Sequence, residues 1–176
     1  LYGKGHYLDA LRTLERAKTK AVEHNQDLLH LEILEFQKLI EARHITLSRQ
    51  VSNKMDLLLN ESGERSHNVL NTSELFSLSI QIHGRYIEGG HSKDEDERLT
   101  TRKFWDSIQA HRVGRASAPN TFHQQVHRFQ AGMWYHYIQL DISAALEAAI
   151  NVQTLFTLSR QMIFKDPDLY LRSMYY

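Results

Sequence analysis

Apolar residues recur every three or four positions along most of the chain, which is the spacing of one face of an α-helix. The first row predicts a helix from about His6 to His24 and consists of Tyr7, Ala10, Leu11, Leu14, Ala17 and Ala21. Asn25 is a suitable N-cap for a second helix, whose main row consists of Leu29, Ile33, Phe36, Ile40 and Leu47. Further leucines widen this second face, which indicates packing on two sides, as in an interior helix of a stack.

The middle of the chain predicts two helices separated by a break. The first covers about 51–70, where the apolar pattern is thin and a polar run surrounds Gly63, so fraying or a bend is expected there. Thr72 or Ser73 is then expected to cap a helix that ends at Gly89-Gly90, because glycine is common just past a helix C-terminus.

The second half of the chain is divided by capping signals. Ser92-Lys93-Asp94-Glu95 fits a capping box and predicts a helix that continues through Ile108. The segment from His111 to Asn120 is expected to form the longest loop and to be the main site of disorder. Thr121 to Gln124 is a second capping-box match, and Asp141 is expected to cap the helix that follows.

A residue pattern near the start of the chain resembles that of a known protein family. The pattern G-x-Y-x-x-A-x-x-x-L-x-x-A is formed by Gly5, Tyr7, Ala10, Leu14 and Ala17. It resembles the second helix of a tetratricopeptide (TPR) repeat, with the glycine opening the turn and the alanines permitting close approach of a neighbouring helix. The resemblance implies a helical repeat that binds a partner rather than a catalytic centre.

The same spacing returns at Ile142, Ala145, Ala149 and Val152, although Leu140 replaces the turn glycine. Ala10 and Ala145 lie 135 residues apart, and three hairpin steps across that distance average about 45 residues, longer than the roughly 34 of a standard TPR. We therefore predict an all-α protein, an antiparallel helix-hairpin solenoid with a TPR-like superhelix of about seven helices. Residues 1–176 are expected to form a single domain.

The resemblance also carries an expectation about the ends of the chain. If Gly5 is the turn glycine of a repeat, Leu1 falls inside a preceding helix. At the other end, Asp166 and Pro167 are a typical N-cap and first-turn pair for a helix that starts close to the last residue. We therefore expect this chain to be part of a longer protein.

Composition narrows the function further. The 21 basic and 21 acidic residues give a formal net charge of zero, which argues against nucleic acid as a partner. Cysteine is absent, which excludes disulfides and thiolate chemistry and suits a cytoplasmic location. A run of about 18 apolar residues is also absent, so no membrane span is expected. Neither a phosphate loop nor a nucleophile elbow is present, so we expect no catalysis and no cofactor.

A candidate partner-binding surface lies on the predicted helix from Thr121 to Leu140. A row offset from its core face consists of His123, His127, Ala131, Trp134 and Ile138, with Arg128 and Tyr135 beside it. The TPR resemblance implies that the first helix of each hairpin faces a groove, and Trp, Tyr and Arg dominate interface energetics. The predicted site is therefore His123, His127, Arg128, Trp134 and Tyr135, holding a protein, a peptide or a second copy of the chain. The alternative is that Trp134 packs against the neighbouring hairpin.

Two other functions stay open. The first is a structural spacer that binds no ligand. The second, which has less support, is a metal-dependent enzyme: His123 and His127 lie four residues apart on one helix face, where one ion can bridge them. The intervening H-Q-Q-V-H sequence has no glutamate to act as a base, and no further ligand is evident. No metal is therefore expected.

Overall fold

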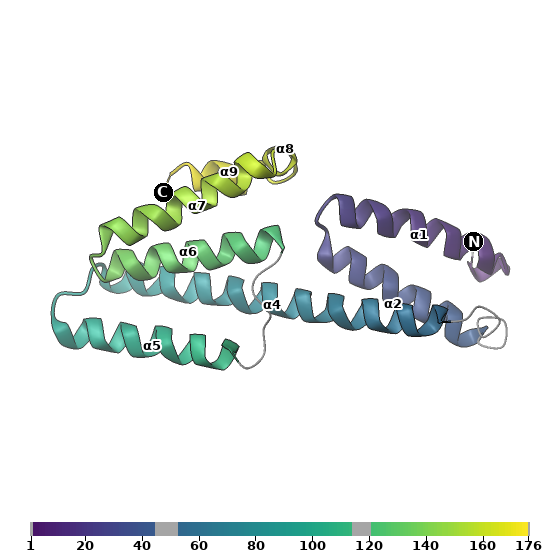
Figure 1. Cartoon of the computed structure of the whole chain (residues 1–176), viewed down its shortest axis with the longest axis horizontal. Helices are drawn as coiled ribbons and strands as arrows, with labels where there is room; N and C mark the ends of the chain where they lie inside the picture. Colours follow the sequence, from purple (N-terminus) through teal and green to yellow (C-terminus); the bar gives the residue numbers. More distant parts are fainter. Residues whose placement is uncertain (1, 45–52, 114–120, 176) are drawn as a thin grey trace. The chain divides into compact units, whose positions relative to one another are not determined.

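The computed structural model describes residues 2–44, 53–113 and 121–175 (Figure 1). Within these ranges the regular structure is eight α-helices and one 3-10 helix, without strands. The prediction of an all-α protein of about seven helices is confirmed. The chain divides into two compact units, residues 1–70 and 71–176, and each is described by itself. The solenoid arrangement and the single domain stay predictions.

The first unit is built on a hairpin of two helices. It contains η1 (Tyr2–Lys4), α1 (Tyr7–Glu23), α2 (Asp27–Arg43) and the part of α4 (Lys54–Gly89) up to residue 70. Gly5 has the positive φ of 81° expected of a turn glycine, and its N–H donates to the carbonyl of Tyr2. The hairpin packs closely because its facing positions are small or aliphatic. The buried apolar residues of this unit are Ala10, Ala21, Ile33, Leu34, Ile40 and Leu58.

The turn between α1 and α2 differs from the prediction. Asn25 does not cap α2, because it adopts a left-handed conformation with φ of 53°. Gln26 occupies the N-cap position without a side-chain hydrogen bond. Asparagine tolerates positive φ better than most residues, so its conformational freedom is used to end α1 rather than to start α2.

The fraying predicted near Gly63, the predicted break after about residue 70 and the predicted cap at Thr72 or Ser73 are wrong, because α4 runs without interruption from Lys54 to Gly89. A helix tolerates one interior glycine at a cost of about 1 kcal/mol. The polar run around Gly63 is not a loop signal, since Glu61, Ser62 and Arg65 bond to α1 and α2. Their partners are Lys18, His30, Glu35, Lys38 and Asp27.

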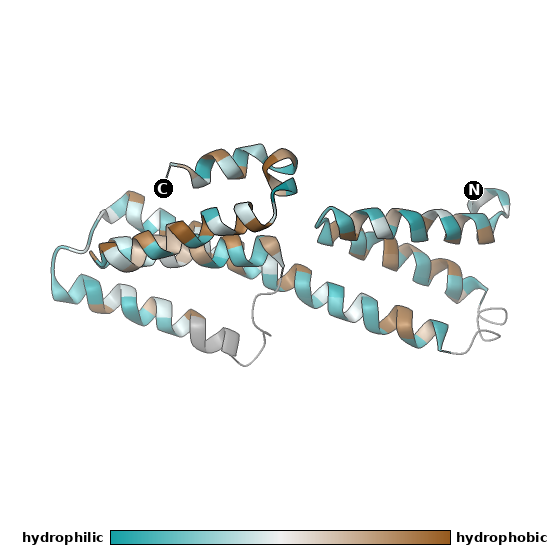
Figure 2. Ribbon diagram, turned by 45° about the horizontal axis from the view of Figure 1, so that its top comes forward, coloured by the Kyte–Doolittle hydropathy of each residue, from teal (hydrophilic) through white to brown (hydrophobic). Residues whose placement is uncertain are grey.

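The second unit is built around α6 (Phe122–Ile138), which packs against helices on two sides. The unit contains the rest of α4, α5 (Glu95–Val113), α6, α7 (Ile142–Leu158), α8 (Gln161–Lys165) and α9 (Pro167–Ser173). Figure 2 shows hydrophobic and hydrophilic residues interleaved along the helices, as expected of amphipathic elements. One face of α6 packs on α4 through Leu78, Ile82, Ala131 and Ile138. Another packs on α7 and α8 through Phe122, Val126, Val152, Phe156 and Met162.

Helix starts in the second unit follow the capping signals. The side chains of Thr121, Asp141 and Asp166 accept hydrogen bonds from backbone N–H groups three residues later, at 3.3, 3.1 and 3.1 Å. These three predicted caps are confirmed. The helix α5 is different, because Asp94 rather than Ser92 accepts the capping bond, from the N–H of Glu97.

The C-terminal ends of α4 and α5 test two further predictions from the sequence. Gly90, with φ of 69°, follows α4 as expected. The helix α5 extends to Val113, so the predicted loop does not begin at His111. The remainder of that predicted loop, 114–120, lies outside the described residues. No helix in the described part of the chain has both the length and the apolar character that crossing a membrane requires.

Candidate binding site

Aromatic rings from α4 and α6 form a cluster in the second unit. The Trp134 ring stacks on His83 at a centroid distance of 4.1 Å and on Tyr86 at 5.0 Å. Tyr137 meets Tyr86 edge to face at 5.3 Å. Three-residue spacing on both helices places His83 and Tyr86 on one face of α4 and Trp134 and Tyr137 on one face of α6. Each aromatic pair adds about 0.5–1.5 kcal/mol beyond area burial, so this cluster holds the two helices in register.

A pocket of about 270 Å³ opens beside this cluster, and we call it the aromatic pocket. Its walls come from α4, α6, α7 and the segment after α9. The lining residues are Tyr86, Met133, Trp134, Tyr137, Ile142, Ala145, Leu146 and Tyr175. Small residues on α7 let it approach α6 closely here, because Ala148 and Ala149 pack against Met133.

The outer wall of the aromatic pocket exposes apolar surface. Ile142 and Leu146 are 52% and 58% exposed, and Tyr175 is 91% exposed. None of the eight lining side chains is an acid, a lysine, an arginine or a histidine. Tyrosine hydroxyls and the Trp134 indole N–H are the hydrogen-bonding groups that the side chains offer. This arrangement suits an apolar or aromatic group with neutral polar contacts, and it provides no general acid or base for neutral pH.

All five predicted partner-binding residues belong to α6. Two of them, Trp134 and His127, contact α4, and His123 contacts its neighbour Phe122. Trp134 lines the aromatic pocket and also packs in the ring cluster, as the alternative interpretation proposed. The His127 ring lies 4.8 Å from the ring of Phe76 on α4. His123 lies against its neighbour Phe122, edge to face at 5.4 Å.

The other two predicted residues lie toward α5 and α7. Tyr135 stacks on Trp105 of α5 at 4.5 Å, with the two rings nearly parallel. Arg128 is exposed and lines a separate hollow together with Trp105 and Glu147. Arg128 and Trp134 are six positions apart, which places them about 120° from each other around α6. The five residues therefore do not form one surface, and their role in partner binding stays a prediction.

Four of the residues that complete the pocket lie at core positions of the apolar pattern in the sequence. Met133 and Tyr137 belong to the apolar row of α6, and Ile142 and Ala145 belong to that of α7. Helical periodicity separates apolar from polar faces, but it does not tell which part of an apolar face remains uncovered. Only the packing of α4, α6 and α7 makes that distinction.

Burial lowers the pKa of His127 from its ordinary value of 6.5, and the nearby His123 lowers it further. The folded chain therefore binds this proton less tightly than the unfolded chain does. We expect the free energy of unfolding of the second unit to fall as the pH drops below 6.5, until both states are protonated. Urea unfolding followed by tryptophan fluorescence at pH 7.5 and pH 5 measures the change.

In the same measurement, His127→Phe is expected to reduce this pH dependence, because it keeps a ring against Phe76 and removes the proton-binding group. His24→Phe, at an exposed position of the first unit, serves as the control and is expected to leave it unchanged. If His127→Phe kept the pH dependence of the parent chain, His127 would not be the residue whose lowered pKa causes it.

Among the described residues, no group of three or more histidine, aspartate or glutamate side chains is arranged to hold a metal ion. The pair His123 and His127 thus gains no third ligand from that part of the chain. Comparison with models of protein families, with curated proteins and with solved structures found no match to this chain.

Proposed function

We propose that this chain is a TPR-like binding module that holds a protein or peptide segment, with the aromatic pocket as the anchor site and no catalysis. The observation that supports this most strongly is the combination of uncharged walls with half-exposed Ile142 and Leu146 beside stacked aromatic rings. Aromatic anchors in a pocket, surrounded by apolar contacts that exclude water, are typical of the residues that dominate binding energy.

The chemistry of the pocket limits the partner. An ionised side chain would lose its hydration on entering and would find no opposite charge on the walls, which is costly. We therefore expect the bound segment to present an aliphatic or aromatic side chain, with uncharged neighbours. Backbone or side-chain groups of that segment are expected to bond to the hydroxyls of Tyr86, Tyr137 or Tyr175.

Selection from a random peptide display library tests the proposal. We expect the chain to enrich peptides with a common apolar or aromatic anchor, binding in the micromolar range. Leu146→Asp places a carboxylate on the exposed rim without touching the core, and it is expected to weaken these peptides at least tenfold. Leu158→Asp, on the same helix and 78% exposed but outside the pocket, is the matched control and is expected to bind normally.

Two outcomes would contradict the proposal. One is that no peptide family is enriched, as expected if the chain were a structural spacer. The other is that enriched peptides bind Leu146→Asp and Leu158→Asp equally well, in which case the binding surface lies elsewhere.

A further inference from the structure

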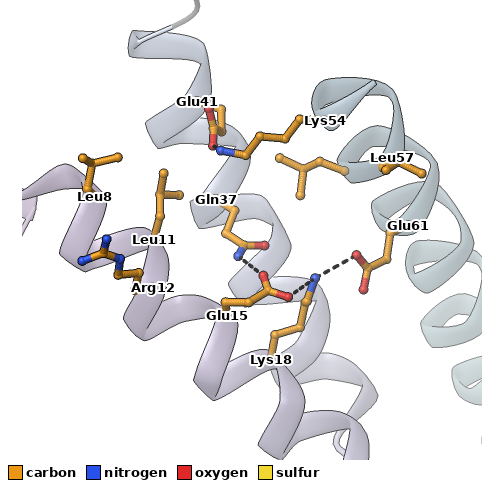
Figure 3. A pocket seen from close by; sticks show the side chains of 11 residues that line it. Leu8, Leu11, Arg12, Glu15, Lys18, Gln37, Glu41, Lys54, Leu57 and Glu61 are labelled. Atoms are coloured by element: carbon orange, nitrogen blue, oxygen red, sulfur yellow. Dashed lines mark hydrogen bonds and ion pairs between the residues drawn. The ribbon is translucent and has the colours of Figure 1, made fainter. Parts of the chain in front are cut away.

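A second cavity, of about 420 Å³, lies within the first unit among α1, α2 and the start of α4 (Figure 3). We call it the polar cavity. One part of its wall is aliphatic and includes Leu8, Leu11 and Leu57. Another part carries carboxylates from three different helices, namely Glu15, Glu41 and Glu61.

Gln37 lies at the middle of the polar cavity and is only 6% exposed. Its Nε2 donates to Oε2 of Glu15 at 3.0 Å. This orientation of the amide is required, because a carboxylate accepts hydrogen bonds and an amide oxygen in the same place would repel it. Figure 3 shows Oε1 of Gln37 turned toward α4, and no group in the described part of the chain donates to that atom. A buried carbonyl oxygen in this position requires a donor.

Lys18 is a cation that lines the cavity, and its ammonium group already has partners. Nζ of Lys18 lies 2.9 Å from Oε1 of Glu15 and 3.1 Å from Oε2 of Glu61. Burial alone would raise the pKa of Glu15, but hydrogen bonds from Lys18 and Gln37 outweigh it and lower the pKa, so this carboxylate is charged at neutral pH. The other oxygen of Glu61 bonds to Nε2 of His30 at 2.9 Å. Each of these carboxylate oxygens still has a lone pair for a further donor.

The other charged residues of the lining are Glu41, Lys54 and Arg12, and they also have partners. Glu41 is 2% exposed and forms an ion pair with Lys54. Arg12 is at the rim, where its side chain is 79% exposed and lies 3.4 Å from Asp9. With Arg12 at the rim set aside, the lining carries three carboxylates against the two ammonium groups of Lys18 and Lys54, and Oε1 of Gln37 is an acceptor without a donor among the described residues.

We propose that the polar cavity binds an aliphatic primary ammonium group, carried by a lysine side chain or by a free amine. An ammonium group has three N–H donors and no acceptor. Its donors meet Oε1 of Gln37 and the free lone pairs of Glu15, while its alkyl chain lies along Leu8, Leu11 and Leu57. This site is in the first unit and is independent of the function proposed for the aromatic pocket.

Titration of the ¹⁵N-labelled chain at pH 7 with 1,5-diaminopentane tests the proposal. We expect saturable shifts of amides around the cavity and of the Gln37 side-chain NH₂, weakened by added salt. The neutral 1,5-pentanediol and the anion pentanoate are expected to leave these signals in place. A second titration, with Nα-acetyl-lysine-N-methylamide, separates the sources, because shifts with both amines assign a lysine side chain and shifts with the diamine alone assign a free amine.

Two variants tie the binding to the cavity. Gln37→Met keeps the length of the side chain without the carbonyl and is expected to lower the affinity for the diamine at least fivefold. Gln153→Met, at an exposed position of α7, is the control and is expected to keep that affinity. Leu57 is 67% exposed, so Leu57→Lys is expected to fold normally and to block the site with its own ammonium group, while Leu57→Gln does not. Equal shifts with the diol or pentanoate, or unchanged diamine affinity in both Gln37→Met and Leu57→Lys, would overturn the proposal.

Discussion

Replacing Phe156 with alanine is expected to lower the free energy of unfolding of the second unit by about 3–5 kcal/mol. The side chain is 1% exposed and lies between α6 and the C-terminal helices. Its ring meets Phe122 at 5.1 Å and Tyr170 at 5.2 Å, both edge to face. Alanine removes both contacts and leaves a cavity that rigid helices fill only in part.

Urea unfolding followed by tryptophan fluorescence measures this effect, because Trp105 and Trp134 are the chain's two tryptophans and both belong to the second unit. Leu158→Ala, two positions away on α7 but 78% exposed, is the control and is expected to change stability by less than about 0.5 kcal/mol. A loss below about 1 kcal/mol in Phe156→Ala would show that α7 does not pack on α6 as described.

The second large effect is expected for Trp134→Ala, at about 3–5 kcal/mol. The substitution removes the stacks on His83 and Tyr86 and the contact with Met133, Ala148 and Ala149. It also removes a wall of the aromatic pocket. Chemical unfolding followed by circular dichroism at 222 nm measures the loss, since one of the two tryptophans is absent from this variant.

Trp134→Phe is the matched variant and is expected to recover part of that stability, because a smaller ring still stacks on His83. This comparison separates the two interpretations of Trp134 from the sequence. A residue that served only as an exposed partner contact would tolerate alanine with a change below about 1 kcal/mol. That outcome would contradict the packing role.

The sequence was sufficient to predict that the chain is helical and to predict several helix boundaries, although it divided α4 into two helices. Capping by Thr121, Asp141 and Asp166 depends on hydrogen bonds within a few residues, so local sequence is enough to predict it. The fraying expected near Gly63 and the cap expected at Asn25 were wrong, because glycine and asparagine each have more than one structural use. Whether a glycine interrupts a helix depends on the partners that α1 and α2 offer to its polar neighbours, and those are distant in sequence.

The candidate site was less predictable. Trp134 was selected from the sequence, but Tyr86 and Leu146 join it from α4 and α7, and no short pattern connects them. Arg128 was grouped with Trp134 because both are near in sequence and suited to interfaces, although they lie on different faces of α6. A pocket depends on which apolar surface packing leaves uncovered, and this is a tertiary property.

The central claim is that the aromatic pocket is the anchor site for an apolar peptide. Its most direct test is a ¹⁵N NMR titration with a peptide selected on this chain, observed at the two indole N–H signals. We expect a saturable shift of the Trp134 signal, while that of Trp105, which stacks on Tyr135 away from the pocket, stays in place. A peptide that binds and leaves the Trp134 signal unmoved would contradict the account.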